Sequence, residues 1–219
     1  MTAKTRLRGR PKSFDDKSAQ NVIQSLDRAL DVLDKLATGG GLTLSEISSQ
    51  MDQSPATIYR VLVTLELRGV VEVDAAMQTW DIGPTAFRLG SAFLRRSNVV
   101  ERSRPVMRRL MLETGETANL GIEKSDMVMF ISQVETHESI RAFFPPGTLS
   151  PMHASGIGKA LLSCYTSERV TRLVQTHPLE RFTPQTILTG AGLADELEQI
   201  RERGFAFDNE EKAAGMRCI

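Results

Sequence analysis

The sequence predicts an α+β protein with two domains: a helical N-terminal domain that ends in a β-hairpin, and a C-terminal domain of interleaved strands and helices. Three observations lead to this prediction. The chain has 219 residues, which is long for one core and comfortable for two. Apolar residues recur at spacings of three and four over much of residues 19–68, and the spacing shifts toward two from Thr117. Runs of turn-forming residues separate these periodic segments.

Composition places the chain among packed globular proteins. Apolar residues make up 41% of it, and no stretch approaches the roughly 18 apolar residues that a membrane span requires. Basic residues near the N-terminus are not followed by an apolar run, so we expect no secretion signal and a cytoplasmic location. Cys164 and Cys218 lie far apart without the spacing of a zinc site, and we therefore expect free thiols.

Residues 1–18 are predicted to form a basic arm without a fixed fold. Because Lys plus Arg and Asp plus Glu both number 27, a nucleic-acid role must rest on local clusters of cations. The string from Arg8 to Lys12 is similar to an AT-hook, whose Gly-Arg-Pro core lies in a narrow A·T minor groove. We expect Arg8, Arg10 and Lys12 to contact DNA. The alternative is a generic basic tail.

Residues 19–83 are predicted to form a winged helix-turn-helix. A first amphipathic helix ends at a run of glycines at 39–41. Thr43 and Glu46 have the spacing of a capping box at the start of a second, short helix. A third helix begins where Ser at the N-cap precedes Pro at the first helical position, and it is expected to run to Arg68.

A hairpin directly after this third helix is typical of a wing, with expected strands at 70–73 and 79–82. Two short helices joined by a tight turn place the second one in the major groove of DNA. Ser54, Thr57 and Arg60 are expected to face the groove, where Arg reads guanine and hydroxyls bond phosphates or bases. Tyr59 has two open interpretations, a phosphate contact or packing under the wing. The alternative for the whole face is an ordinary solvated surface.

Residues 84–98 are expected to form a linker helix, and residues 99–219 a separate domain. Helices are predicted at 99–113, within 152–163, at 170–175 and at 193–203. Strands are predicted around 118–122 and 128–131, at 140–144 and at 205–208.

Three segments resemble the IclR family of bacterial regulators: Thr43 to Arg68 with its hairpin, His153 to Leu162, and Glu211 to Ile219. The resemblance implies a winged helix joined by a helix to a GAF-like effector-binding domain, assembled as homodimers or homotetramers on a pseudo-palindromic operator. It implies a small organic-acid effector, with 2-oxo or hydroxy acids such as glyoxylate or pyruvate favoured. Such proteins continue beyond the point that corresponds to Ile219, so we expect a C-terminally shortened chain with some pocket residues missing.

Four residues are expected to bind the effector. Gly156 and Ile157 lie where a loop becomes a helix, so their N–H groups and the helix dipole favour an anion, although a simple helix cap is the alternative. The resemblance adds Asp208 as an acceptor for a ligand hydroxyl and Cys218 as a pocket thiol. Their alternatives are a strand-end cap and a buried small apolar side chain.

The predicted function is ligand-controlled transcriptional regulation through DNA binding. A phosphate-loop interpretation of the glycines before Lys159 fails, because His153 stands at the first glycine position and Ala160 at the Ser/Thr position. No set of catalytic or metal-binding residues can be assembled from local spacing, so we expect no enzymatic activity, no cofactor and no metal-ligand residues, and a metal in the pocket stays an open alternative. A rival hypothesis is a redox- or metal-responsive regulator that acts through Cys164 and Cys218.

Overall fold

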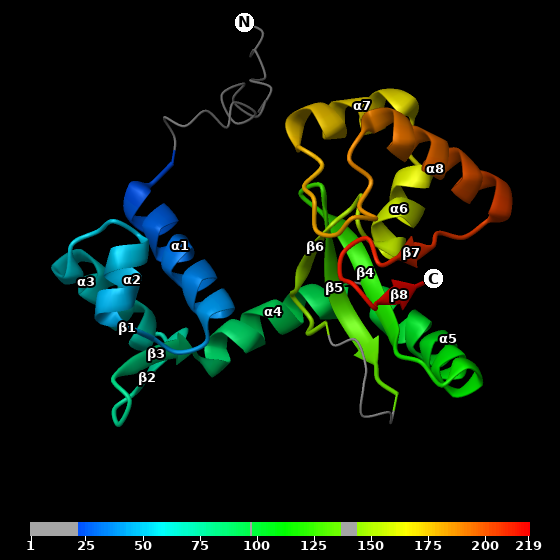
Figure 1. Cartoon of the computed structure of the whole chain (residues 1–219). Helices are drawn as coiled ribbons and strands as arrows, with labels where there is room; N and C mark the ends of the chain where they lie inside the picture. The colour runs from blue at the N-terminus through cyan, green and yellow to red at the C-terminus, as the bar shows by residue number, and fades with distance from the viewer. Residues whose placement is uncertain (1–21, 97, 137–143) are drawn as a thin grey trace, which may run out of the picture. The chain divides into compact units, whose positions relative to one another are not determined.

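The computed structural model describes residues 22–96, 98–136 and 144–219. The chain divides into two compact units, residues 1–93 and 94–219 (Figure 1). The division falls inside helix α4 (Pro84–Arg96). Each unit has a hydrophobic core of its own.

The helices of the first unit begin and end close to the predicted positions: α1 (Gln24–Gly39), α2 (Leu44–Gln50) and α3 (Pro55–Glu66). Gly40 closes α1 in a left-handed conformation with φ 62°. The capping box of α2 is present, with Glu46 Oε2 accepting from the Thr43 N–H at 2.8 Å. Helix α3 ends two residues earlier than expected, because the chain turns at Gly69, whose φ is 65°.

The wing is a three-stranded antiparallel sheet in the order β1-β3-β2. Its hairpin strands, β2 (Val71–Asp74) and β3 (Thr79–Ile82), were predicted within one residue. Strand β1 (Leu42–Thr43) was not predicted, because two residues are too few to show a period. A core of buried residues joins the sheet to the three helices: Val32, Leu36, Ile47, Ile58, Leu62, Val71 and Trp80.

In the second unit, α5 (Val99–Thr114) packs on an antiparallel sheet with the order β4-β5-β6. The long strands β4 (Ala118–Lys124) and β5 (Met127–Val134) confirm the predicted shift in period. The third strand of this sheet in the described residues is β6 (Leu149–Pro151), which pairs with β5. Of the strand expected at 140–144, residues 140–143 lie outside the described residues, and Phe144 stacks its ring on Phe130 at 4.6 Å.

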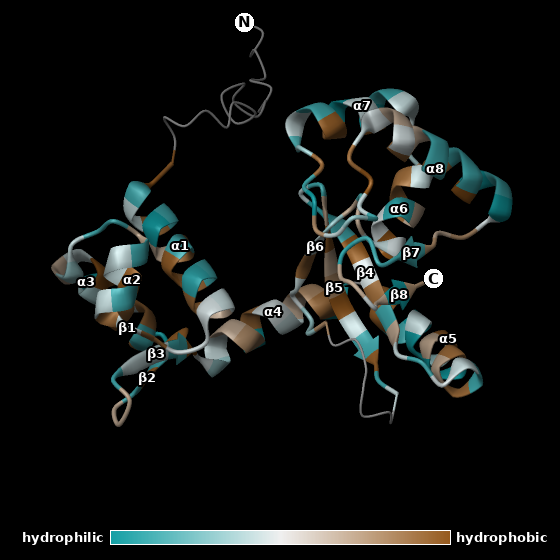
Figure 2. Cartoon of the chain, in the orientation of Figure 1, coloured by the Kyte–Doolittle hydropathy of each residue, from teal (hydrophilic) through white to brown (hydrophobic). Residues whose placement is uncertain are grey.

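Three helices complete this unit: α6 (Gly156–Ser163), α7 (Ser167–Thr176) and α8 (Gly190–Arg203). Their apolar faces share one core with strand β5, and hydrophilic residues mark much of the outer surface of α7 and α8 (Figure 2). The chain ends in a small ladder, β7 (Asp208–Asn209) with β8 (Arg217–Cys218). The strand expected at 205–208 is therefore displaced toward the C-terminus, because Asp208 is the residue that pairs with Cys218. In the described part of the chain, no helix has the length and apolar character needed to cross a membrane.

Candidate DNA-reading helix and effector site

The start of α3 presents the predicted polar face. Ser54 Oγ accepts the Thr57 N–H at 3.3 Å and lies 2.9 Å from Thr57 Oγ1. The Ser54 hydroxyl thus has a capping role, which leaves it less free for DNA than the sequence suggested. On the opposite side of the helix, Ile58 and Leu62 are completely buried. This anchoring fixes which face of α3 is exposed.

Tyr59 and Arg60 both point away from the core of the first unit. Tyr59 is 51% exposed, so it is not buried under the wing and its hydroxyl can reach a phosphate. Arg60 is exposed, and among the described residues its side chain has no hydrogen bond or ion pair. An unengaged guanidinium next to the helix start is free to form a bidentate contact with a base.

Two further features of the first unit bear on DNA contact. Asp74 Oδ1 accepts the Ala76 and Met77 N–H groups at 2.8 and 3.1 Å, and this shapes the tip of the wing. Arg68, which follows α3, is exposed and was not among the predicted contacts. A cation directly after the third helix could have been predicted as a DNA contact from the sequence.

The predicted contacts Arg8, Arg10 and Lys12 lie outside the described residues.

Helix α6 begins inside the second unit. Ser155 is only 8% exposed, and its hydroxyl accepts the Gly158 N–H at 3.0 Å. A Cβ atom at Gly158 would lie 2.2 Å from the Met152 carbonyl oxygen, so only glycine allows the preceding loop to pack on the helix. The N–H groups of Gly156 and Ile157 belong to the first helical turn, where no carbonyl of the helix can accept them. Acceptors for these two donors must therefore come from outside the helix.

Three of the four expected effector-binding residues meet at this point. A Cβ atom at Gly156 would lie 3.8 Å from Cys218 Cβ and 3.9 Å from Asp208 Cβ. Asp208 and Cys218 are themselves paired in the β7–β8 ladder. Ile157 turns its side chain toward strand β4, where a Cβ atom at Gly121 would lie 3.2 Å from it. Only the N–H group of Ile157 is therefore available to a ligand.

Asp208 is 1% exposed, and its Oδ1 accepts the Glu211 N–H at 2.9 Å. It thus caps the turn after β7, as its alternative interpretation foresaw, and this bond leaves its Oδ2 atom available. Burial raises the pKa of Asp208, while the Glu211 N–H and the charge of Lys159 act in the opposite direction. A buried carboxylate with one fixed hydrogen bond is a strong acceptor for a second donor.

The rival redox hypothesis depends on Cys164 and Cys218, which lie in different surroundings. Burial, with the nearby Asp208 charge, raises the pKa of the Cys218 thiol to about 11, so the reactive thiolate form is scarce near neutral pH. Cys164 is exposed at the C-terminal end of α6, whereas Cys218 lies at its N-terminal end. Eight helical residues separate those ends by about 12 Å, which exceeds the reach of a disulfide. No metal-binding group of three or more His, Cys, Asp or Glu occurs among the described residues.

Sequence reasoning missed the most deeply buried charge of this unit, the side chain of Lys159. Its exposed fraction is 0%, and its Nζ donates to Phe207 O and Glu211 Oε1, both at 2.6 Å, and lies 3.4 Å from Glu196 Oε1. The signal was present, because Lys159 precedes the buried Leu162 by three positions and so shares its helix face.

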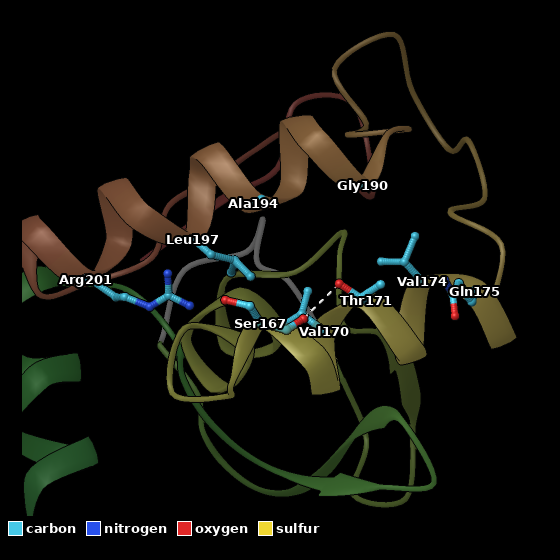
Figure 3. A pocket seen from close by; sticks show the side chains of 9 residues that line it. All are labelled: Ser167, Val170, Thr171, Val174, Gln175, Gly190, Ala194, Leu197 and Arg201. Atoms are coloured by element: carbon cyan, nitrogen blue, oxygen red, sulfur yellow. Dashed lines mark hydrogen bonds between the residues drawn. The ribbon is translucent and has the colours of Figure 1, made fainter.

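A separate cleft of about 300 Å³ lies between α7 and α8 (Figure 3). Its surface is mostly apolar, and at one end Arg201 already donates to the Ser163 carbonyl and to Glu198. None of the expected effector-binding residues lines this cleft. The two places are distinct, and of the two only the start of α6 lies beside a buried carboxylate, that of Asp208.

Comparison with known proteins agrees with both units. Residues 25–75 match the IclR helix-turn-helix domain, and residues 91–219 match the family described as bacterial transcriptional regulator IclR C-terminal. The chain belongs to the IclR family. The HTH-type transcriptional regulator BhcR of Paracoccus denitrificans is 55% identical, over 100% of this chain and 80% of that protein. The transcriptional repressor IclR of Escherichia coli is 37% identical, over 97% of this chain and 78% of that protein.

Solved structures of IclR regulators share the fold. That of Thermotoga maritima IclR is 29% identical with a TM-score of 0.69, covering 89% of this chain and 79% of its own. An IclR regulator from Alicyclobacillus acidocaldarius is 24% identical with a TM-score of 0.79, over 90% of this chain and 80% of its own. The chain is thus a DNA-binding transcriptional regulator of the IclR family, a family of regulators and not of enzymes.

Proposed function

We propose that this regulator binds a small 2-oxo or 2-hydroxy carboxylate, such as glyoxylate or pyruvate, between the start of α6 and the β7–β8 ladder. Binding there changes its affinity for operator DNA. The observation that supports this most directly is the approach of Gly156 to Asp208 and Cys218, within 3.9 Å of a Cβ atom placed on the glycine. A glycine at this point leaves backbone donors open beside a buried acceptor.

The chemistry of the site suits an acid that carries a hydroxyl or a hydrated carbonyl. Its carboxylate accepts from the Gly156 and Ile157 N–H groups, where the helix dipole adds favourable potential. Its hydroxyl donates to Asp208, which cannot itself attract the negative charge of the ligand. The Cys218 thiol closes the side of the site as a small apolar group.

On the DNA side, the proposal assigns base contacts to Thr57 and Arg60 of α3 and a phosphate contact to Tyr59. A homodimer or homotetramer presents two such helices to a pseudo-palindromic operator. The effector changes the affinity for DNA because it binds two arrangements of the assembly with different free energies.

The test is a DNA-binding titration with and without acids. The full chain is bound to a duplex that it has itself selected from a random pool, and fluorescence anisotropy follows glyoxylate, pyruvate and acetate titrations. We expect the two oxo acids to shift the midpoint of DNA binding by about fivefold or more, which is typical of allosteric coupling, and acetate to shift it less. An unchanged midpoint with every acid would refute the effector proposal while leaving the DNA-binding role intact.

A matched pair of variants locates the effect. Gly156→Val places two methyl groups between α6 and β8, so it should abolish the response to glyoxylate and leave DNA binding unchanged. Gly190→Val is the control, because Gly190 is also the first residue of a helix, α8, but has only Val174 near its Cβ position, at 3.6 Å. Equal glyoxylate affinity in the two variants would place the acid elsewhere.

A further inference from the structure

The turn between β7 and β8 is held by one buried cation. Lys159 Nζ donates to Phe207 O on one side of Asp208 and to Glu211 Oε1 on the other, both at 2.6 Å. Between these two anchor points, Asp208 Oδ1 accepts the Glu211 N–H. The ammonium group therefore spans the segment that carries the proposed effector acceptor.

Glu211 depends on Lys159 for its place in the interior. Its side chain is 9% exposed, and burial raises the pKa of this carboxyl against the opposing charge of Lys159. Among the described residues, Lys159 is the one side chain that donates to this carboxylate. The Oε2 atom of Glu211 is buried without a partner. Loss of the lysine would leave a buried charge uncompensated, which drives such a group toward water.

Further contacts of the turn come from the loop between α7 and α8. The hydroxyls of Thr183 and Thr186 donate to the Glu210 and Glu211 carbonyls, each at 2.7 Å. These bonds hold the backbone of Glu210 and Glu211 but do not reach Phe207 or Asp208. The residue before Asp208 is held from α6, because Lys159 donates to the Phe207 carbonyl.

Lys159 lies three residues after Gly156, so one turn of the same helix carries both the open amides and the ammonium group. We propose that Lys159 is a positioning residue: it fixes Asp208 at a set distance from the first turn of α6, so that an acid is recognised by its carboxylate and its hydroxyl together. This inference rests on the proposed effector site and adds a determinant of its specificity. The lysine itself does not touch the ligand.

A purely structural ion pair would have a different signature. Loss of such a pair would lower the stability of the second unit and weaken the binding of all acids alike. A positioning role instead separates ligands by chemistry: glycolate, which has a hydroxyl, should lose affinity, and acetate, which has none, should keep it. The ratio of these two dissociation constants is therefore the decisive quantity.

Three variants of the full chain make the comparison. Lys159→Met removes the cation. Lys159→Met with Glu211→Met removes both partners of the Lys159–Glu211 pair and replaces them with apolar volume, an exchange that buried ion pairs often tolerate. It therefore answers the question even if the single variant fails to fold. Arg217→Met is the matched control, because Arg217 forms an exposed ion pair with Glu210, at 3.2 Å, on the same ladder.

Calorimetry with glycolate and acetate gives the first readout. The wild type and Arg217→Met should prefer glycolate, and the Lys159 variants should lose this preference by about tenfold, the loss expected for one hydrogen bond to a charged group. If the double variant still prefers glycolate over acetate, the inference is overturned.

Hydrogen exchange of the Glu211 amide, bonded to Asp208, gives a readout without ligand. Its protection should fall in the Lys159 variants and stay as in the wild type in Arg217→Met. If the wild type binds neither acid, the proposed function fails, and this exchange still decides whether Lys159 places Asp208. Unchanged protection of the amide in the double variant also overturns the inference.

Discussion

Helices α3 and α6 begin with the same local device and end in different surroundings. Each has a serine N-cap whose hydroxyl accepts the N–H three residues later, at 3.3 Å for Ser54 and 3.0 Å for Ser155. Ser54 is exposed, whereas Ser155 is 8% exposed. At the first helical position stands Pro55 in one and Gly156 in the other.

This difference shows how one structural element serves two kinds of recognition. The start of α3 is surrounded by solvent and offers side chains, which suits the broad surface of a DNA groove. The start of α6 is enclosed by the β7–β8 ladder and offers backbone amides, which suits a small anion. Enclosure strengthens the attraction, because a charge interacts more strongly with a dipole where water is excluded.

The largest expected effect is on the stability of the second unit, and it comes from Gly158→Ala at the start of α6. The new Cβ would lie 2.2 Å from the Met152 carbonyl oxygen, so the loop before α6 must move, and overpacking of this severity costs about 3 kcal/mol or more. Urea denaturation should show the second unit destabilised and the first unchanged. An unaltered midpoint would show that the loop and helix are not packed as tightly as described.

Gly90→Ala is its control. Gly90 lies within α4, and nothing would approach a Cβ there within 4 Å. Because alanine favours the helix over glycine, this exchange should stabilise the protein by up to about 1 kcal/mol. The two glycine replacements thus differ in sign, although both positions are helical.

The next effect concerns the exposed helix. Arg60→Ala should weaken binding to the selected operator by about 1 to 3 kcal/mol, the range for a lost base contact, and leave binding to random duplex nearly unchanged. Anisotropy titrations measure the affinity for the selected operator and the affinity for the random duplex. Arg172→Ala on α7 removes the same charge from an exposed position of the other unit and should change neither. Equal losses on both duplexes would make Arg60 a phosphate contact.

Local signals predicted most of the first unit. The capping box at Thr43, the Ser54-Pro55 start and the glycine stop at 40 are short-range devices whose physics lies within a few residues. The same holds for the hairpin. What the sequence did not reveal is strand β1, since its two residues acquire strand character only by pairing with β3.

The second unit was less open to local reasoning. Its helices were predicted by period, but Asp208 and Cys218 entered the site only through the family resemblance, because their meeting with Gly156 depends on long-range packing. Lys159 was missed for a related reason: a lysine suggests an exposed position until its partner, Glu211, is brought to it from a distant segment. The spacing of Lys159 from Leu162 indicated a shared helix face, but nothing in local spacing indicated Glu211 as its partner.

The smallest expected effect compares the two serine caps directly. Ser54→Ala removes a cap whose Thr57 N–H can turn to water, so the loss of stability should be about 0.5 to 1 kcal/mol. Ser155→Ala leaves the Gly158 N–H buried, and a buried donor without a partner costs about 1 to 3 kcal/mol. Hydrogen exchange, followed separately in α3 and α6 under increasing urea, gives each unit its own free energy of opening. The expected difference is about 1 kcal/mol, with α6 the more sensitive helix. Equal costs would mean that water reaches the start of α6 as freely as that of α3, and the enclosed anion site proposed there would lose its physical basis.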